Sequence, residues 1–179
     1  MTPLVEYAAV LLRQPGSLLV IDIDGTLAFD TYRSHLRPAS NSACLCACPV
    51  DEIERYMSPD LVRLDEKAPG ARPVVTRLLE AADHTIVATS RWERLRGVTE
   101  TWLADHFPEL LAWPLFMRPD DATALPSADV KVSAVMHYRR NVAGLTSTAP
   151  AVWLDDDDGL LGIVGKGGFL PLRAPDVYG

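Results

Sequence analysis

The chain has 179 residues, of which 48% are hydrophobic and 23% charged, and its formal net charge is −7. This composition argues against intrinsic disorder, and no apolar run reaches the roughly 18 to 20 residues of a membrane-spanning helix. The acidic balance argues against broad, non-specific affinity for nucleic acid, because such affinity needs basic surface. Since Glu6 interrupts the apolar N-terminal stretch and no basic residue precedes it, the sequence does not resemble a signal peptide. We therefore expect a cytoplasmic protein with one domain over residues 1–179.

The first half of the chain contains one regular stretch and one irregular stretch. Thr2-Pro3 predicts the start of a helix, with threonine as its cap and proline at its first position. Residues 18–21 are all apolar, which predicts a strand that is buried on both faces. Residues 27–70 mix Pro, Ser, Cys, Asp and Arg without sustained periodicity. We expect a small, loop-rich insertion there, with a short helix around 51–57.

Regular elements return after residue 70. The spacing of apolar residues predicts helices at about 74–82 and 95–102 and from Ser127, and strands at 85–88, 111–117, 151–154 and 169–172. Pro114 places the 111–117 strand near an edge of the sheet. Strands that alternate with helices predict an α/β fold, with a central and mainly parallel five-stranded sheet between two helical layers.

Three of the predicted strands end in clusters of polar residues. These clusters are Asp22 with Asp24, Thr89-Ser90-Arg91, and the run from Asp155 to Asp158. In open parallel α/β sheets, ligands bind beyond the carboxyl ends of the strands. We therefore expect these polar groups to converge on one site.

Asp22-Ile23-Asp24-Gly25-Thr26 is the most distinctive local pattern. Residues i and i+2 of a strand point the same way, and two neighbouring carboxylates repel each other unless a cation or a shared proton intervenes. Gly25 permits a tight turn that a side chain would hinder. An ordinary Asp-Gly turn after a strand is the alternative interpretation.

These residues resemble the first motif of the haloacid dehalogenase (HAD) superfamily. Thr89 after the second predicted strand resembles the second motif, and Lys131 near the start of a helix resembles the third. Leu154-Asp155-Asp156 resembles the fourth, so the similarity extends over most of the chain. The resemblance implies a Rossmann-like HAD fold in which residues 27–70 form a short cap over a rather open active site.

The resemblance also implies a mechanism of phosphate-ester hydrolysis. Asp22 would be the nucleophile that forms an aspartyl-phosphate. Asp24 would protonate the leaving group and then activate the hydrolytic water. Thr89 would donate a hydrogen bond to a phosphoryl oxygen, and Lys131 would supply positive charge. The simpler alternatives are that Thr89 caps a helix and that Lys131 is a solvated surface lysine.

A magnesium ion is the cofactor that the resemblance implies. It would be held by Asp22, the backbone carbonyl of Asp24, and either Asp155 or Asp156, because Mg²⁺ prefers oxygen ligands. Asp157 and Asp158 exceed what this chemistry needs, and we interpret them as surface or supporting residues. A solvated acidic turn is the alternative interpretation of the whole run.

A narrower resemblance is to the 3′-phosphatase domain of polynucleotide kinase–phosphatases, and phosphatase domains of RNA-repair proteins look similarly close. It is carried by the Asp22 motif, Thr89-Ser-Arg91, Met117-Arg118-Pro, Asp129-Val-Lys131 and Leu154-Asp-Asp156. It implies that a DNA or RNA 3′ end is the substrate. Thr26, Ser90, Arg91 and Arg118 would then contact it, arginine having a fork geometry suited to phosphate. The sequence contains no GxxxxGK[ST] phosphate loop of a kinase.

Two other functions stay open. One is a HAD phosphatase of small phosphometabolites or nucleotides, and the other is a non-catalytic phosphate-binding module, because fold does not fix function. Cys44, Cys46 and Cys48 lack the paired spacing of structural zinc sites, so we interpret them as small residues of the insertion. The sequence does not indicate an oligomeric state.

Overall fold

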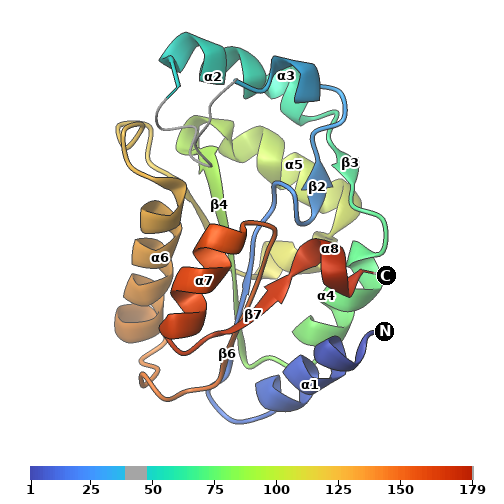
Figure 1. Ribbon diagram of the computed structural model, residues 1–179, viewed down its shortest axis with the longest axis vertical. Coiled ribbons are helices and arrows are strands. Elements are labelled where there is room, and N and C mark those ends of the chain that lie inside the picture. Colours follow the sequence, from blue (N-terminus) through green and yellow to red (C-terminus); the bar gives the residue numbers. More distant parts are fainter. Residues whose placement is uncertain (39–47, 179) are drawn as a thin grey trace.

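The computed structural model describes residues 1–38 and 48–178, and its centre is a five-stranded sheet (Figure 1). The strand order is β5-β4-β1-β6-β7, and every neighbouring pair is parallel. The strands are β1 (Leu18–Ile21), β4 (His84–Trp92), β5 (Leu115–Arg118), β6 (Ala151–Asp155) and β7 (Leu170–Arg173). The predicted α/β class and five-stranded parallel sheet are therefore confirmed.

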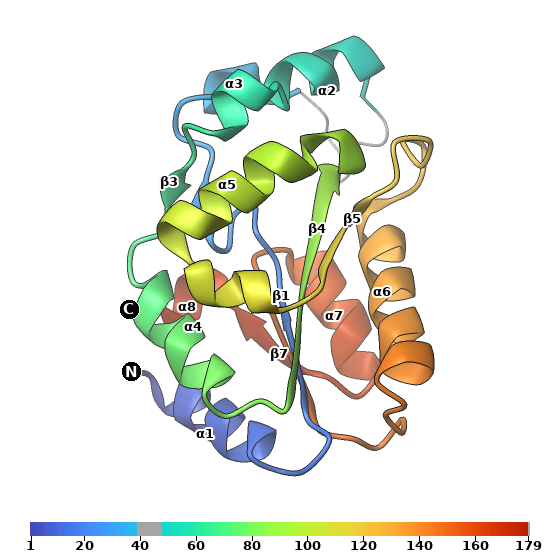
Figure 2. The same ribbon diagram turned by 180° about the vertical axis from the view of Figure 1, so that it is seen from behind.

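Helices cover both faces of this sheet (Figures 1 and 2). One layer contains α6 (Ser127–His137) and α7 (Asp158–Lys166); the other contains α1 (Pro3–Leu12), α4 (Ala71–Leu79), α5 (Arg96–His106) and α8 (Ala174–Val177). Successive side chains of a strand point to opposite faces. In β1, Leu18 and Val20 accordingly pack in the core under α6 and α7, whereas Leu19 and Ile21 pack in the core under α1 and α4. This double burial explains why β1 is apolar throughout.

The 27–70 segment contains more regular structure than its composition indicated. Its ends pair as an antiparallel ribbon of β2 (Ala28–Phe29) and β3 (Glu66–Lys67). Between them lie η1 (Ser34–Leu36), α2 (Val50–Tyr56) and α3 (Pro59–Val62), so the short helix around 51–57 is confirmed. Cys44 and Cys46 lie outside the described residues, whereas Cys48 is partly buried.

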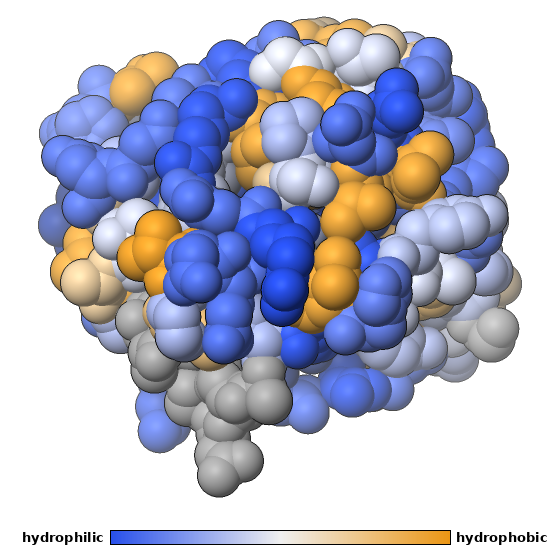
Figure 3. Space-filling model, turned by 90° about the horizontal axis from the view of Figure 1, so that it is seen from above, coloured by the Kyte–Doolittle hydropathy of each residue, from blue (hydrophilic) through white to orange (hydrophobic). Residues whose placement is uncertain are grey.

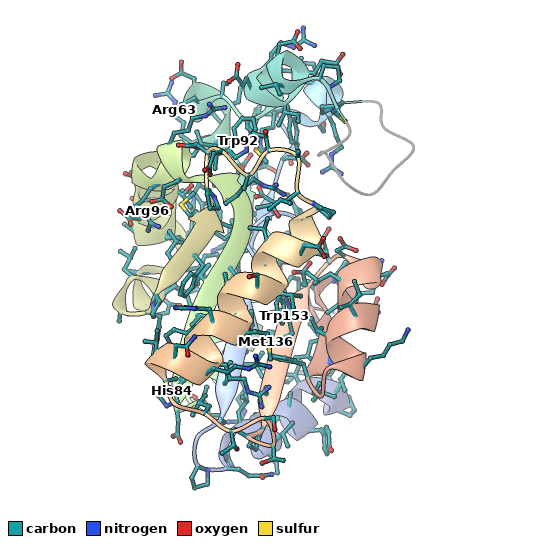
Figure 4. The ribbon with its side chains drawn as sticks, turned by 90° about the vertical axis from the view of Figure 1, so that its left-hand side faces the viewer. Arg63, His84, Trp92, Arg96, Met136 and Trp153 are labelled. Carbon is teal, nitrogen blue, oxygen red and sulfur yellow. The ribbon has the colours of Figure 1, made fainter. Side chains whose placement is uncertain are left out.

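The 27–70 segment packs over the carboxyl end of β4 and β5 through an apolar cluster. Ile53, Tyr56, Met57 and Val62 contribute from the segment, and Trp92, Leu95 and Met117 contribute from the sheet and the helix-like turn that follows it. Trp92 lies at the end of β4, next to the helices of the segment (Figure 4). Seen from above, the surface is mainly hydrophilic with apolar side chains between the polar ones (Figure 3).

The predicted strand at 111–117 is wrong at its start. Residues Pro108–Ala112 form the 3₁₀ helix η4, and β5 begins only at Leu115. Pro114 has no N–H to donate to a ladder, which is consistent with a strand that begins after it. The predicted edge position of this strand is confirmed. The remaining short elements are η3 (Glu93–Leu95) and η5 (Tyr138–Val142). Across residues 1–38 and 48–178, the helices are too short or too polar to cross a membrane.

Candidate active site

A cleft of about 440 Å³ opens at the carboxyl edge of the sheet. The residues after β1 and β6 form its acidic side, and Tyr56 and Met57 of the 27–70 segment contribute to its apolar side. Ser90 and Trp92 on β4 and Arg118 on β5 complete much of the rest. The three strand-end clusters seen in the sequence therefore do meet at one place, as parallel strands require.

Three carboxylates gather in this cleft. One oxygen from each of Asp22, Asp155 and Asp156 lies within 4.8 Å of the others. Lys131, on the first turns of α6, reaches into the group: its Nζ is 2.8 Å from Asp22 Oδ1 and 3.0 Å from Asp155 Oδ2. One ammonium does not balance three carboxylates. The cluster could therefore hold a metal ion, and its all-oxygen donor set suits a hard divalent cation.

The two candidate ligands that follow β6 differ in their partners. Asp155 is fully buried; its Oδ2 accepts a hydrogen bond from Trp153 Nε1 at 3.2 Å, and its Oδ1 accepts one from the backbone N–H of Asp157 at 3.0 Å. The Asp156 carboxylate has no ion pair with any described residue. Asp155 is thus the fixed member of the cluster, and Asp156 offers the free carboxylate.

Gly25 is needed for the approach of Asp156. Its φ is +79°, a left-handed conformation that other residues rarely adopt. A Cβ atom at this position would lie 2.2 Å from Asp156 Oδ2. The glycine of the Asp-x-Asp-Gly pattern therefore makes the turn and also leaves room for a carboxylate of the acidic cluster.

The charges in the cluster shift one another's protonation. Burial raises the pKa of Asp22 well above its usual range, and Asp155 and Asp156 add to this while Lys131 opposes it. Burial and the charge of Asp155 raise the pKa of Asp156 to about 6. Although burial works against it, Asp22 and Asp155 raise the pKa of Lys131 above its ordinary value. A cation in the cluster would favour the ionised carboxylates.

Asp24 faces a different environment. Its Oδ1 accepts from Arg33 Nη2 at 2.7 Å and from Arg91 Nη2 at 2.9 Å. The same two arginines bind Asp65, with Arg33 at 2.8 Å and Arg91 at 2.7 Å from Asp65 Oδ2. Burial works to raise the pKa of Asp24, but Arg91 and Arg33 outweigh it and hold this pKa far below its usual range. The Asp24 carboxylate is therefore ionised, and it lies outside the three-carboxylate cluster.

Two members of this network were not anticipated from the sequence. Arg33 and Asp65 come from the two ends of the 27–70 segment, and both side chains are fully buried. In the sequence they look like ordinary charged residues of a polar loop, since no local pattern marks a long-range ion pair. Trp102 on α5 donates from Nε1 to the backbone oxygen of Asp65 at 2.7 Å, which fixes the segment against the sheet domain.

The structure separates the residues predicted to contact the substrate. Ser90 and Arg118 line the cleft, whereas Arg91 directs its hydrogen bonds to Asp24 and Asp65 instead. Thr26 is fully buried in the turn after β1 and is not part of the cleft lining.

Thr89, on β4, lies beside Asp24. Its side-chain hydroxyl is 3.4 Å from Asp24 Oδ2 and accepts a hydrogen bond from the backbone N–H of Arg91 at 3.2 Å. The hydroxyl therefore belongs to the surroundings of Asp24 and not to a helix cap.

The last two aspartates of the acidic run have structural partners. Asp157 caps α7 by accepting hydrogen bonds from the backbone N–H groups of Gly159 and Leu160. Asp158 forms an exposed ion pair with Arg173 at 2.8 Å. These contacts agree with the interpretation of Asp157 as a supporting residue and of Asp158 as a surface residue, both outside the carboxylate cluster.

Comparison with known proteins identifies a structural neighbour only. No family model matches the sequence, and no curated protein matches it. Among solved structures, a chain of the Pnkp1/Rnl/Hen1 RNA repair complex superposes with a TM-score of 0.58 at 14% sequence identity. The match covers 88% of this chain and 42% of that chain, so this chain spans less than half of the neighbour's length. At this identity the similarity shows the shared fold.

Proposed function

We propose that this chain is a magnesium-dependent phosphatase of the HAD type, with Asp22 as its nucleophile. The observation that carries the proposal is the convergence of Asp22, Asp155, Asp156 and Lys131 at the carboxyl edge of a parallel sheet. The order of the motifs along the chain supports it. In this proposal residues 1–179 form one cytoplasmic domain, and the 27–70 segment is the cap over its active site.

The proposed reaction has two steps. An Asp22 carboxylate oxygen attacks phosphorus, the bond to the leaving oxygen breaks, and that oxygen takes a proton from Asp24. Water then attacks the aspartyl-phosphate, Asp24 accepts a proton from it, and phosphate leaves as the Asp22 carboxylate is restored. Lys131, 2.8 Å from Asp22, stabilises negative charge on the phosphoryl group. The motif resemblance assigns Thr89 a hydrogen bond to the same group; in the structure its hydroxyl lies 3.4 Å from Asp24 Oδ2 and outside the cleft lining.

The arginine pair around Asp24 favours the second step of this reaction, the attack of water on the aspartyl-phosphate. An ionised Asp24 is ready to accept a proton from water in the second step. To act as an acid in the first step it must first gain a proton, which Arg33 and Arg91 oppose. We therefore expect esters with good leaving groups, which need little protonation, to react fastest.

The residues present fit a magnesium ion. Asp22, Asp155 or Asp156, and the backbone carbonyl of Asp24 would hold it, and Asp156 provides a carboxylate that forms no ion pair with a described side chain. When bound, Mg²⁺ would offset the negative charge of the cluster and of the phosphate ester.

A nucleic-acid 3′ end is the substrate we propose. The motif resemblance to polynucleotide 3′-phosphatases supports it, and the fold shared with a chain of an RNA repair complex is consistent with it. Ser90 and Arg118 line the cleft and would contact the substrate directly. Thr26 and Arg91 lie outside the cleft lining, so in this proposal they support the residues of the cleft and do not contact the substrate themselves.

Phosphate release tests the proposal directly. The wild type, Asp22→Asn and the exposed control Asp158→Asn would each be given an aryl phosphate and a 3′-phosphorylated oligonucleotide, with Mg²⁺ or with EDTA. We expect turnover that EDTA abolishes, a loss of about a thousandfold or more in Asp22→Asn, and wild-type rates in Asp158→Asn. Retained activity in Asp22→Asn would overturn the nucleophile assignment, and a folded wild type inactive on both esters would overturn the phosphatase.

A further inference from the structure

The buried arginines of the described chain fall into two groups. Arg33, Arg91, Arg118 and Arg139 are buried, and the first two are paired with carboxylates. Arg139 lies outside the cleft and donates to three backbone carbonyls of the loop that precedes β6. Arg118 lines the cleft and forms no ion pair with a described residue. It is therefore a cation at the cleft with no anionic partner among the residues that the structure describes.

The hydrogen bonds of Arg118 leave much of its guanidinium available. Its Nη1 donates to the backbone oxygens of Ala122 at 2.7 Å and Leu125 at 2.8 Å, which fixes the side chain against the loop after β5. Its Nε and Nη2 have no acceptor among the described residues. With 6% of its surface exposed, the residue is largely removed from water. Nε and Nη2 are not among the buried polar atoms that lack a partner, so they are exposed to the cleft. A cation that is largely desolvated and has no carboxylate partner among the described residues favours an anion at this position.

The neighbourhood of Arg118 provides further donors. Ser127, the first residue of α6, lines the cleft, and its hydroxyl is hydrogen-bonded to that of Ser90. No side chain caps the N-terminus of this eleven-residue helix. The first N–H groups of a helix and its dipole attract anions. The guanidinium, the N-terminus of α6 and the Ser90–Ser127 hydroxyl pair, in which one hydroxyl donates to the other, thus line the same cleft.

Arg118 and Asp22 lie at the ends of different strands, and the spacing of these strands sets how far the guanidinium is from the proposed nucleophile. β5 is separated from β1 by β4 alone. Neighbouring strands are about 4.8 Å apart, so β1 and β5 are roughly 10 Å apart across the sheet, and Arg118 lies three residues beyond the level of Ile21 along the strands. Trp92, the register partner of Arg118, lies on the intervening strand and also lines the cleft. Trp92 and Arg118 therefore lie together at the far end of the cleft from Asp22.

We propose that Arg118, Ser90 and the Ser127 end of α6 form a second anion subsite, and that the preferred substrate is a phosphomonoester carrying a second phosphate group. The inference rests on the proposed function and narrows its substrate class. The second group is either the phosphodiester of a nucleic-acid end or the other phosphate of a small bisphosphate. Either would supply the anion that Arg118 lacks, with bidentate geometry available from Nε and Nη2.

Three substrates with the same scissile 3′-phosphate test the subsite. They are a nucleoside 3′-monophosphate, a nucleoside 3′,5′-bisphosphate, and a 3′-phosphorylated dinucleotide whose second phosphate is a diester. We expect kcat/KM to be roughly ten- to hundredfold higher for at least one of the two doubly phosphorylated substrates than for the monophosphate. Preference for the dinucleotide identifies a nucleic-acid end, and preference for the bisphosphate identifies a small molecule. Equal kcat/KM for all three in the wild type would overturn the subsite.

Variants assign the preference to Arg118. In Arg118→Gln the ratio of doubly to singly phosphorylated substrates should fall towards one, and in Arg118→Lys it should be intermediate, because lysine keeps the charge without the fork. Arg139→Gln is the matched control, since it removes another buried arginine that binds loop carbonyls. It should keep the wild-type ratio. A wild-type ratio in folded Arg118→Gln would overturn the assignment.

Binding measurements distinguish an error in the proposed subsite from an error in the proposed phosphatase function. If the folded wild type hydrolyses none of the three esters, calorimetric titration with the bisphosphate and the monophosphate still compares their affinities. Tighter binding of the bisphosphate that Arg118→Gln abolishes would support the subsite even without turnover. Equal affinities would overturn it.

Discussion

Arg33, Asp65, Arg91 and Asp24 form a closed ring of charges, and removing one member should destabilise the fold. Each arginine contacts both carboxylates at 2.7 to 2.9 Å, so two cations balance two anions. The side chains of Arg33, Arg91 and Asp65 have no exposed surface. Arg33→Met leaves two carboxylates on one arginine. Breaking a buried pair in this way costs about 3–5 kcal/mol.

The expected loss is measurable by urea unfolding followed through tryptophan fluorescence. For a chain of this size, about 3–5 kcal/mol corresponds to a fall in Tm of roughly 6 to 20 °C. Arg37→Met is the matched control: this arginine lies in the same segment, is 60% exposed and has a single ion pair with Asp30. We expect a change of about 1 kcal/mol or less for it, as for other exposed pairs.

A double variant distinguishes charge balance from simple loss of packing. Arg33→Met with Asp65→Leu leaves Arg91 paired with Asp24, so the buried charge returns to zero. The double variant should therefore be more stable than the sum of the single losses predicts, with a coupling of about 2–3 kcal/mol. Additive losses would refute the balanced ring as the source of stability, and a loss of less than about 1 kcal/mol in Arg33→Met would refute the importance of the pair itself.

Three further predictions concern the acidic cluster. Gly25→Ala should cost about 1–3 kcal/mol of stability and weaken Mg²⁺ affinity, because its Cβ displaces Asp156; unchanged affinity in a calorimetric titration would contradict the contact. Lys131→Met should lower Tm in EDTA and enlarge the rise in Tm on adding Mg²⁺, because it removes the ammonium 2.8 Å from Asp22; a rise equal to that of the wild type would count against it. The raised pKa of Asp156, about 6 instead of 3.8, stabilises the metal-free fold at low pH, and this contribution is lost as pH rises through about 6. In EDTA, the Tm of Asp156→Asn should therefore rise relative to the Tm of the wild type as the pH goes from 4 to 7. A difference in Tm that stays constant over this range would disprove the raised pKa of Asp156.

The elements that the sequence predicted well are those fixed by local periodicity. Buried parallel strands appear in the sequence as short apolar runs, and the polar residues that follow them indicate the carboxyl edge of the sheet. Asp22 and Asp155 could be brought together in this way, because each follows a predictable strand. Lys131, in the first turns of α6, was placed with them by the motif resemblance. The carboxyl ends of parallel strands lie at one edge of the sheet, so Asp22 and Asp155 come together for any conformation of the loops.

The substrate contacts were harder to predict because adjacent residues of a strand face opposite sides. β4 continues to Trp92, so Ser90 and Trp92 line the cleft while Arg91, between them, points to the other side. Treating Ser90 and Arg91 as joint contacts assumed that the strand ended earlier. Arg33 and Asp65 could not be found at all, since their pairing depends on how the 27–70 segment folds back on the sheet.

Charge balance links the two proposals. Asp24 is neutralised by its own arginines, but the cluster around Asp22 keeps an excess of negative charge. Arg118, across β4, keeps a positive charge that no described carboxylate pairs. A divalent cation would correct the first imbalance, and an anion would correct the second. A phosphate ester alone, bound at the cation, leaves Arg118 unsatisfied. A substrate with two phosphates satisfies both ends at once, so the same electrostatic argument that favours a cation at Asp22 favours a doubly phosphorylated ligand in the cleft.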